Sequence, residues 1–163
     1  MDLTKKALAF LGTNRETTDR EIARWGADFI PDFLGVCPRA AIPDLVGKKI
    51  EPGSSFVLNL DFGDYSRGGT HWTGAYFTKE EPLQCLYFDS FGMPPPRDLT
   101  LRCMSERVPV WYSDVQYQAA DEENCGPRAL AALYCLATAP DDLEEYKELC
   151  TEESDGEGLT DED

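Results

Sequence analysis

Residues 124–128, which read Asn-Cys-Gly-Pro-Arg, are followed by a run of apolar residues from Ala129 to Ala137. Ala and Leu dominate this run, and both are strong helix formers. Pro127 suits a first helical turn, where its missing N–H is no loss. Because the run is apolar nearly all round, we predict a buried helix with Cys125 at its N-terminus, where the helix dipole favours a thiolate.

A second helical pattern lies near the start of the chain. Thr18 and Glu21 fit a capping box, in which the side chain of each binds the backbone N–H of the other. The pattern predicts an amphipathic helix that runs to about Asp28 and is ended by Pro31. Its apolar residues recur at helical spacing: Ile22, Trp25, Phe29 and Ile30.

Several shorter segments have the composition of strands. Residues 55–61, 71–78, 84–89 and 108–113 are rich in β-branched and aromatic residues and are bounded by turn signals. Segments 71–78 and 84–89 are close enough in sequence to form a hairpin. We expect residues 33–36 to form a buried loop or a short extended piece, residues 38–47 to be irregular, and helices to begin near Arg97 and Leu143.

Length and charge bound the domain organisation. The 163 residues suffice for one domain with its own core. The net charge is −16, but residues 121–163 hold 15 acidic and two basic side chains, so the body of the protein is nearly balanced. We therefore predict a single domain over residues 1–150 and an acidic, disordered tail over residues 151–163, which contain one apolar side chain.

Cysteine usage predicts a reducing, intracellular environment with mostly free thiols. No pair of cysteines forms a C-x-x-C motif, and the single histidine leaves no Cys/His zinc pattern, so we expect no metal site. The N-terminus lacks the apolar core of a signal peptide, and no run approaches the ~20 residues that span a bilayer. The six cysteines are Cys37, Cys85, Cys103, Cys125, Cys135 and Cys150.

A catalytic cysteine needs a base, and His71 is the one histidine in the chain. A hairpin turn centred near Glu80 places Asp89 directly opposite His71, so that a carboxylate can bind the imidazole Nδ1–H. A register shift of one residue would put the two on opposite faces of the sheet. Taken singly, each residue also has a structural interpretation: a cysteine beside a helix cap, a histidine at a strand start, and an aspartate that forms a turn before Ser90.

Acyl transfer also requires hydrogen-bond donors for the oxyanion. The backbone N–H of Cys125 is one candidate. Gln116 and Gln118, which precede the cysteine helix, are candidates for a second donor through their side-chain amides. The residues alone leave the choice between the two glutamines open.

Together these motifs resemble the adenovirus endopeptidase (adenain) family, which is related to the SUMO-specific and other ubiquitin-like-protein proteases. The resemblance covers roughly residues 30–137, and one of its motifs uses the single histidine. The chain departs from the family in being shorter, in its acidic tail and in an acidic triplet, residues 121–123, before the cysteine. The motifs, in the order and approximate spacing of the family, are Phe33-Leu34-Gly35, His71-Trp72, Phe88-Asp89-Ser90-Phe91-Gly92, an upstream glutamine and Asn124-Cys125-Gly126.

The resemblance implies an α+β fold, with a central mixed sheet against which the cysteine helix packs. It also implies a role for each matching residue. Cys125 is the nucleophile, His71 the general base and Asp89 the acid that orients the base. Gln118, seven residues before the cysteine, is preferred to Gln116 as the oxyanion donor, and Trp72 shields the histidine and walls the substrate cleft.

The implied function is that of a cysteine endopeptidase cleaving after glycine-containing sites. The resemblance favours a monomeric viral maturation protease that processes capsid or core precursor proteins in the host nucleus or cytoplasm and in the virion. Two alternatives remain: a deconjugase that removes a ubiquitin-like modifier, and an inactive interaction module whose acidic tail recruits a basic partner. Three roles are open for the acidic triplet, residues 121–123. It complements the helix N-terminus, it attracts basic substrate residues, or it disfavours the thiolate form of Cys125.

Adenoviral enzymes are assisted by a viral peptide and by DNA, and the charge of this sequence opposes activation by DNA. A protein that grips a phosphate backbone needs clustered Lys and Arg, whereas the basic residues of this chain are scattered and its C-terminal part is strongly acidic. We expect that no cofactor is required, that DNA does not activate and that no membrane is involved. A peptide activator stays open.

Overall fold

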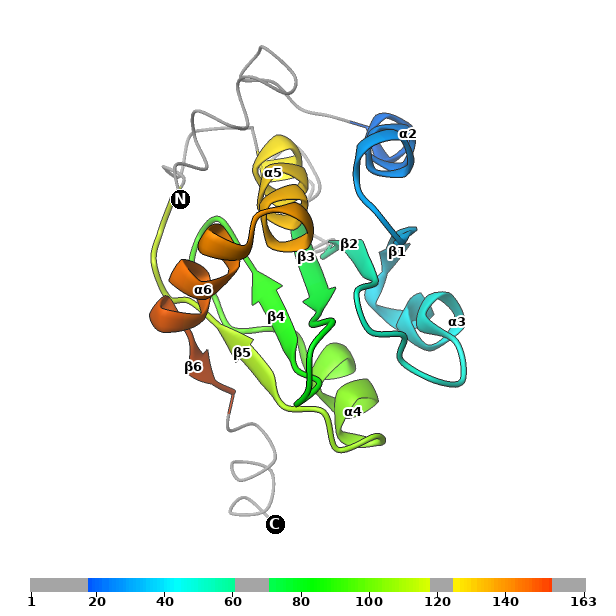
Figure 1. Cartoon of the computed structure of the whole chain (residues 1–163). Helices are drawn as coiled ribbons and strands as arrows, with labels where there is room; N and C mark the ends of the chain where they lie inside the picture. Colours follow the sequence, from blue (N-terminus) through cyan, green and yellow to red (C-terminus); the bar gives the residue numbers. More distant parts are fainter. Residues whose placement is uncertain (1–17, 61–70, 118–124, 154–163) are drawn as a thin grey trace.

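The computed structural model describes residues 18–60, 71–117 and 125–153. These residues form an α+β fold in which five helices pack against a six-stranded mixed sheet (Figure 1). The strands follow their order in the sequence: β1 (Phe33–Pro38), β2 (Ser55–Asn59), β3 (Trp72–Phe77), β4 (Cys85–Phe88), β5 (Val110–Tyr112) and β6 (Thr151–Glu152). Pairs β1–β2 and β4–β5 are parallel, and the other three pairs are antiparallel.

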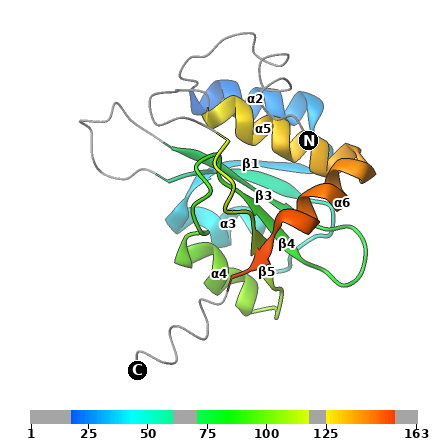
Figure 2. The same ribbon diagram turned by 90° about the vertical axis from the view of Figure 1, so that its left-hand side faces the viewer.

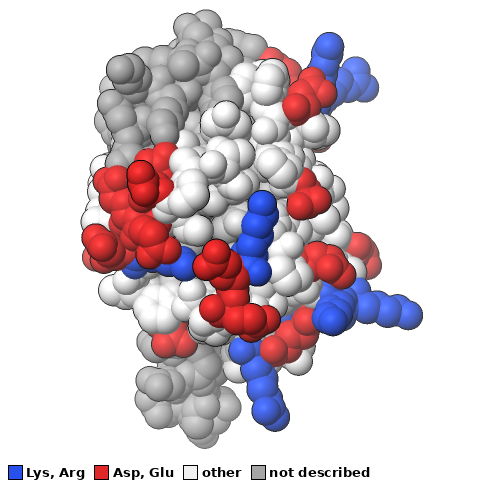
Figure 3. All heavy atoms as spheres, in the orientation of Figure 1, with Lys and Arg blue, Asp and Glu red and all other residues white. Residues whose placement is uncertain are grey.

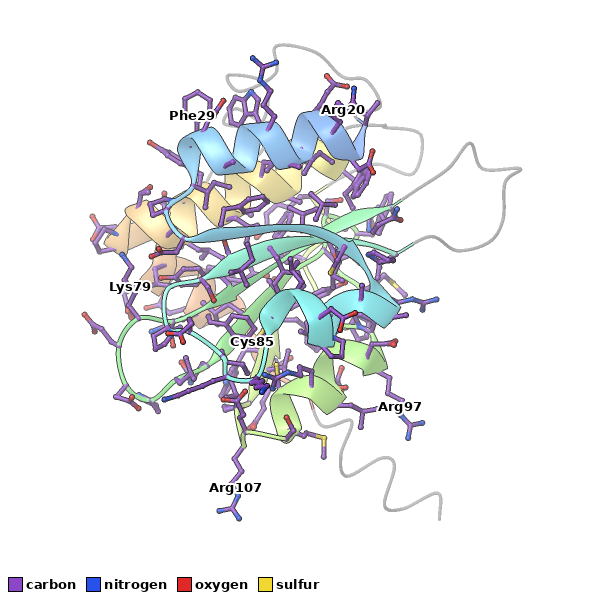
Figure 4. All side chains as sticks on the ribbon, turned by 90° about the vertical axis from the view of Figure 1, so that its right-hand side faces the viewer. Arg20, Phe29, Lys79, Cys85, Arg97 and Arg107 are labelled. Carbon is purple, nitrogen blue, oxygen red and sulfur yellow. The ribbon has the colours of Figure 1, made fainter. Side chains whose placement is uncertain are left out.

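Helices cover both faces of the sheet (Figure 2). Helices α2 (Asp19–Phe29), α5 (Cys125–Thr138) and α6 (Pro140–Leu149) lie on one face, and their apolar residues share a core with Trp72, Tyr76 and Phe88. The other face carries α3 (Ile42–Val46), which follows the short 3-10 helix η1 (Arg39–Ala41), and α4 (Arg97–Met104). Cys85 lies between this face and those helices (Figure 4).

Helix α5 is the central helix, as its apolar pattern predicts. Eleven of its residues are buried, including Cys125 at the first position. It packs closely on β3, because a side-chain carbon added at Gly74 would lie 3.0 Å from Leu133. The absence of a side chain at Gly74 thus lets the helix approach the sheet. This close approach sets the distance between the N-terminus of α5 and strand β3.

The structure confirms the helix after Thr18, including its capping box, and corrects one neighbouring prediction. Residues 33–36 take the extended alternative and belong to strand β1, which runs to Pro38, whereas the stretch predicted to be irregular contains α3. A six-residue edge strand is stabilised by its partner β2 rather than by a strong pattern of its own. Helix α3 has proline in its first turn, where proline is tolerated, and buries Ile42 and Val46.

Strands β3 and β4 form the predicted hairpin, but its register differs from the expected one by two residues. Gly74 pairs with Phe88, and Phe77 pairs with Cys85. Continued toward the open end, this register places Asp89 opposite Thr73 rather than His71. Because side chains alternate between faces with a period of two, a shift of two leaves His71 and Asp89 on the same face of the sheet.

The predicted tail begins three residues too early. Thr151 and Glu152 form strand β6, which pairs with β5, and the Glu153 N–H donates to the Val110 carbonyl at 2.7 Å. Backbone hydrogen bonds to the open edge of β5 order this segment despite its acidic composition. The rest of the predicted tail, residues 154–163, lies outside the described residues.

Acidic side chains gather over α6 on the face shown in Figure 3. The sequence of this helix contributes Asp141, Asp142, Glu144, Glu145 and Glu148. Within the part of the chain that the structure describes, no helix is both long and apolar enough to cross a membrane.

Candidate active site

His71 and Asp89 are brought together just outside the paired residues of β3 and β4. His71 Nε2 lies 2.7 Å from Asp89 Oδ1, and both residues are buried, with 5% and 2% of their surfaces exposed. Asp89 Oδ1 also accepts a hydrogen bond from the Phe91 N–H at 2.8 Å. The carboxylate oxygen that faces the imidazole is therefore held by both its own turn and the histidine.

The nitrogen that faces Asp89 differs from the expected one. Nε2, not Nδ1, binds the carboxylate, which directs Nδ1 to the Cys125 thiol, the second hydrogen-bonding partner of the imidazole. With Nε2–H donated to Asp89, Nδ1 is the ring nitrogen that accepts the thiol proton.

Cys125 is the first residue of α5, with 8% of its surface exposed. Its Sγ accepts a hydrogen bond from the backbone N–H of Trp72 at 3.4 Å. The thiol thus lies between a donor from the start of β3 and the neighbouring imidazole. A backbone donor and a helix N-terminus both favour negative charge on the sulfur.

The protonated form of His71 is favoured by its partners. Burial by itself lowers the pKa of the imidazole, but hydrogen bonds to Asp89 and Cys125, together with their negative charges, raise the pKa from 6.5 to about 9. An imidazolium between a carboxylate and a thiolate is the arrangement that these interactions stabilise. Between these two groups, His71 is therefore expected to be protonated at neutral pH.

The turn after Asp89 supplies one wall of the site. The Phe91 ring packs on the imidazole, with ring centroids 4.7 Å apart. Gly92 ends the turn with φ of +71°, and a side-chain carbon there would lie 2.5 Å from the Asp114 carbonyl oxygen. Only glycine satisfies both conditions, so this residue fixes the position of Phe91 and of the carboxylate.

The other predicted site residues have different outcomes. Trp72 is adjacent to Cys125, but its side chain is only 5% exposed and belongs to the core beneath α5, so its role in a substrate cleft stays a prediction. Gln116 is exposed. Gln118 and the acidic triplet lie outside the described residues, so their roles also stay predictions.

Two features of the site leave little signal in the sequence. The donor to Cys125 is a backbone N–H, which every residue other than proline possesses. Arg128, one helical turn after the cysteine, is 1% exposed although charged side chains are rarely buried. Its position in an apolar run is the pattern that could have indicated a buried arginine.

Among the described side chains, no group of three His, Cys, Asp or Glu residues is arranged to hold a metal ion. A cavity of about 330 Å³ lies at the far end of α5, lined by residues such as Thr78, Thr138 and Pro140. The chemistry that the site supports is proton transfer from a thiol to an imidazole, followed by nucleophilic attack.

Comparison with models of known protein families and with curated protein sequences finds no match to this chain.

Proposed function

We propose that the protein is a cysteine endopeptidase of the adenain type. The observation that supports this most directly is the chain of contacts from Cys125 through His71 to Asp89, in which the single histidine lies between the thiol and the carboxylate. A structural cysteine needs no such partners. The order of residues along the chain, His71, Asp89 and then Cys125, and the position of the cysteine at a buried helix N-terminus also agree with the adenain resemblance.

The proposed reaction proceeds by acyl transfer. The thiol proton moves to His71 Nδ1, and the thiolate attacks the carbonyl carbon of the scissile peptide bond. The imidazolium then gives its proton to the leaving amine, which departs and leaves a thioester on Cys125. His71 next removes a proton from a water molecule that attacks the thioester, so that the carboxylic acid product and the free thiol are formed.

Three groups assist these steps. Asp89 holds the imidazole in the tautomer with hydrogen on Nε2 and stabilises the imidazolium. The Trp72 N–H stabilises the thiolate before attack. The backbone N–H of Cys125 and the side-chain amide of Gln118 are the proposed donors to the oxyanion, and the adenain resemblance supports this assignment.

The proposed substrates are polypeptides with glycine at the acyl side of the scissile bond. By resemblance, these are viral capsid or core precursor proteins, and Trp72 restricts the cleft at that residue. A deconjugase acting on a ubiquitin-like modifier shares this chemistry and is the second candidate. The two differ in whether a folded modifier is cleaved better than a short peptide of the same C-terminal sequence.

A peptide library with sequencing of the cleavage sites tests the function. Wild-type protein is expected to cleave after glycine, and Cys125→Ala is expected to abolish cleavage. Asp89→Asn, which imposes the wrong tautomer on His71, should lower kcat by at least about 100-fold. Cys150→Ala, which removes a thiol outside the site, is the matched control and should retain activity.

Two outcomes would contradict the proposal. Wild-type protein that cleaves no peptide and forms no adduct with a glycinal peptide inhibitor would be an inactive interaction module. A library profile dominated by bulky or charged residues at the acyl position would exclude the adenain-type specificity.

A further inference from the structure

Beside the site, three buried polar atoms lack a hydrogen bond of ordinary length to any described residue. They are Asp89 Oδ2, Thr73 Oγ1 and the Tyr87 hydroxyl oxygen. The residues themselves are 2%, 0% and 0% exposed. Buried polar atoms are nearly always hydrogen-bonded, and an unbonded carboxylate oxygen is especially costly, so three such atoms in one place call for a physical explanation.

The sheet places these three residues on one face. Continuing the register of the hairpin puts Thr73 directly opposite Asp89, and directly opposed residues have Cβ atoms roughly 4.5–5.5 Å apart. Tyr87 precedes Asp89 by two residues on β4 and therefore shares its face. Helices α3 and α4 cover this face, where Tyr87 belongs to the buried core.

The electrostatics of Tyr87 agree with this placement. Burial raises the pKa of the Tyr87 hydroxyl, the charge of Asp89 raises it further, and the Thr73 hydroxyl acts in the opposite direction as a hydrogen-bonding partner. Because none of the three atoms forms a direct bond of ordinary length, a slight rotation of a hydroxyl or a single bridging water would be needed to join them. Such a water has the two to four polar partners that a buried water requires.

We propose that Thr73 and Tyr87 are positioning residues that donate hydrogen bonds, directly or through one buried water, to Oδ2 of Asp89. This inference rests on the proposed function, since it concerns the acid that orients His71. Oδ1 of Asp89 is held by His71 and by the Phe91 N–H. Donors on Oδ2 fix the second oxygen, so that the plane of the carboxylate cannot turn away from the imidazole.

Several ionisable groups act on Tyr87, and one of them, Arg39, is also a hydrogen-bond donor. Besides Asp89, these are Cys85, which is a buried neighbour on the same face of β4, and Arg39 of η1. Arg39 is exposed at the edge of this region. The Phe91 N–H donates to Oδ1 rather than Oδ2. The two hydroxyls are therefore the donors that the fold directs to the far side of the carboxylate.

The single histidine makes a direct test available. In protein labelled with ¹⁵N-histidine, the one ring Nε2–H resonance reports how firmly Asp89 holds His71, and it requires no substrate. The variants are Thr73→Val and Tyr87→Phe, which remove the hydroxyls with little change of shape, and the double variant. Thr73→Ser restores a hydroxyl, and Ser55→Ala removes an equally buried, unbonded hydroxyl from β2 on the opposite face.

In wild-type protein the Nε2–H proton should exchange slowly with solvent. We expect the double variant to exchange at least about tenfold faster and to lose about tenfold in kcat with KM nearly unchanged, as the loss of hydrogen bonds to a charged group implies. Thr73→Ser and Ser55→Ala should behave like wild type in both measurements. Thermal unfolding followed by circular dichroism checks that each variant is folded.

The proposal is overturned if the double variant keeps slow exchange and full kcat, or if it is more stable than wild type, which would mean that the hydroxyls were truly unbonded. A change of the same size in Ser55→Ala would show a general effect of altered packing. The spectra also separate this inference from the proposed function. Faster exchange in a protein that cleaves no peptide would leave the positioning role intact and the peptidase assignment wrong.

Discussion

His71 has a protonation equilibrium that should be visible in the stability of the whole protein. Its pKa rises from 6.5 to about 9 on folding, so the folded state binds this proton more tightly than the unfolded state. The resulting contribution is fully present below pH 6.5 and is lost as the pH rises through about 9. We expect the free energy of unfolding to fall by up to about 3 kcal/mol across this window.

Urea unfolding at several pH values under reducing conditions measures this effect. The buried thiols and tyrosines also weaken the fold at high pH, because burial raises the pKa of Cys37 to about 11 and of Cys150 to about 12. His71→Gln is therefore the necessary comparison. The difference between wild type and this variant should disappear above pH 9, and an unchanged difference across the window would refute the ion-pair arrangement.

A second prediction at the residue scale concerns thiol reactivity. Iodoacetamide at neutral pH should alkylate Cys125 at least about tenfold faster than any other thiol, because the imidazole accepts its proton. Cys85, Cys103 and Cys135 are at most 1% exposed, and Cys150, although half-buried, has its pKa raised to about 12 by burial. Mass spectrometry of the labelled peptides gives the rates. His71→Ala should remove the advantage, and equal labelling of all six thiols in folded protein would count against the site.

The pairing of His71 with Asp89 could be predicted from the sequence because it depends on the parity of the hairpin register. The predicted register was wrong by two residues, yet the two side chains still meet. The nitrogen that binds Asp89, the Trp72 N–H and the hydroxyls beneath Asp89 could not be predicted in this way. Each depends on distances of a few ångströms between strands, whereas a sequence pattern specifies only faces and order.

At the scale of elements, the close packing of α5 on β3 determines where Cys125 lies. Gly74→Ala brings a side-chain carbon to 3.0 Å from Leu133, which forces the helix away from the sheet by a few tenths of an ångström. We expect a loss of about 1–3 kcal/mol in the free energy of unfolding and a lower kcat, since Cys125 moves with the helix. Denaturant unfolding and peptide hydrolysis measure the two effects.

A double-mutant cycle provides the control. In the background of Leu133→Ala, which removes the atoms that Gly74→Ala contacts, the added cost of the glycine substitution should largely disappear. If the two substitutions prove additive, the contact does not set the spacing between α5 and β3.

The elements that the sequence predicted well are the ones whose own patterns are strong. Helices α2 and α5 have a capping box or a continuous apolar run. For strand β1 the sequence left a loop and an extended piece as alternatives, and helix α3 and strand β6 were missed, because two to six residues carry too little periodicity. Their structure is decided by partners far away in the sequence, as when β5 orders Thr151 and Glu152.

At the scale of the whole molecule, the net charge and its distribution affect whether a nucleic acid can bind and activate the protein. The net charge is −16, and the face that includes α6 carries a cluster of acidic side chains (Figure 3). Binding of a phosphate backbone needs clustered basic residues and weakens steeply with salt. We expect duplex DNA to raise peptidase activity by no more than about threefold near physiological salt, about 0.7 kcal/mol. Strong stimulation that fades along a salt series would contradict this expectation.

Two C-terminal truncations should distinguish the contribution of strand β6 to stability from that of the acidic residues that follow it. Deleting residues 154–163, which contain one apolar side chain, should change neither Tm nor peptide hydrolysis. Deleting residues 151–163 removes β6 and its hydrogen bonds to β5. We expect this longer deletion to lower the free energy of unfolding by about 1–2 kcal/mol, and equal Tm values for the two truncated proteins would show that β6 adds no stability.

The nucleophile and the backbone donor that binds its sulfur are separated by 53 residues of sequence. During translation, His71 and Asp89 are therefore made first, and Cys125 follows Asp89 after about 2–7 s, at synthesis rates of about 5–20 residues per second. The thiol meets its base only after α5 has been made and has packed on β3. Under the proposed function, a nascent chain would therefore be unable to cleave its own emerging segments, or its neighbours on the same messenger RNA, until this late helix has packed on the sheet.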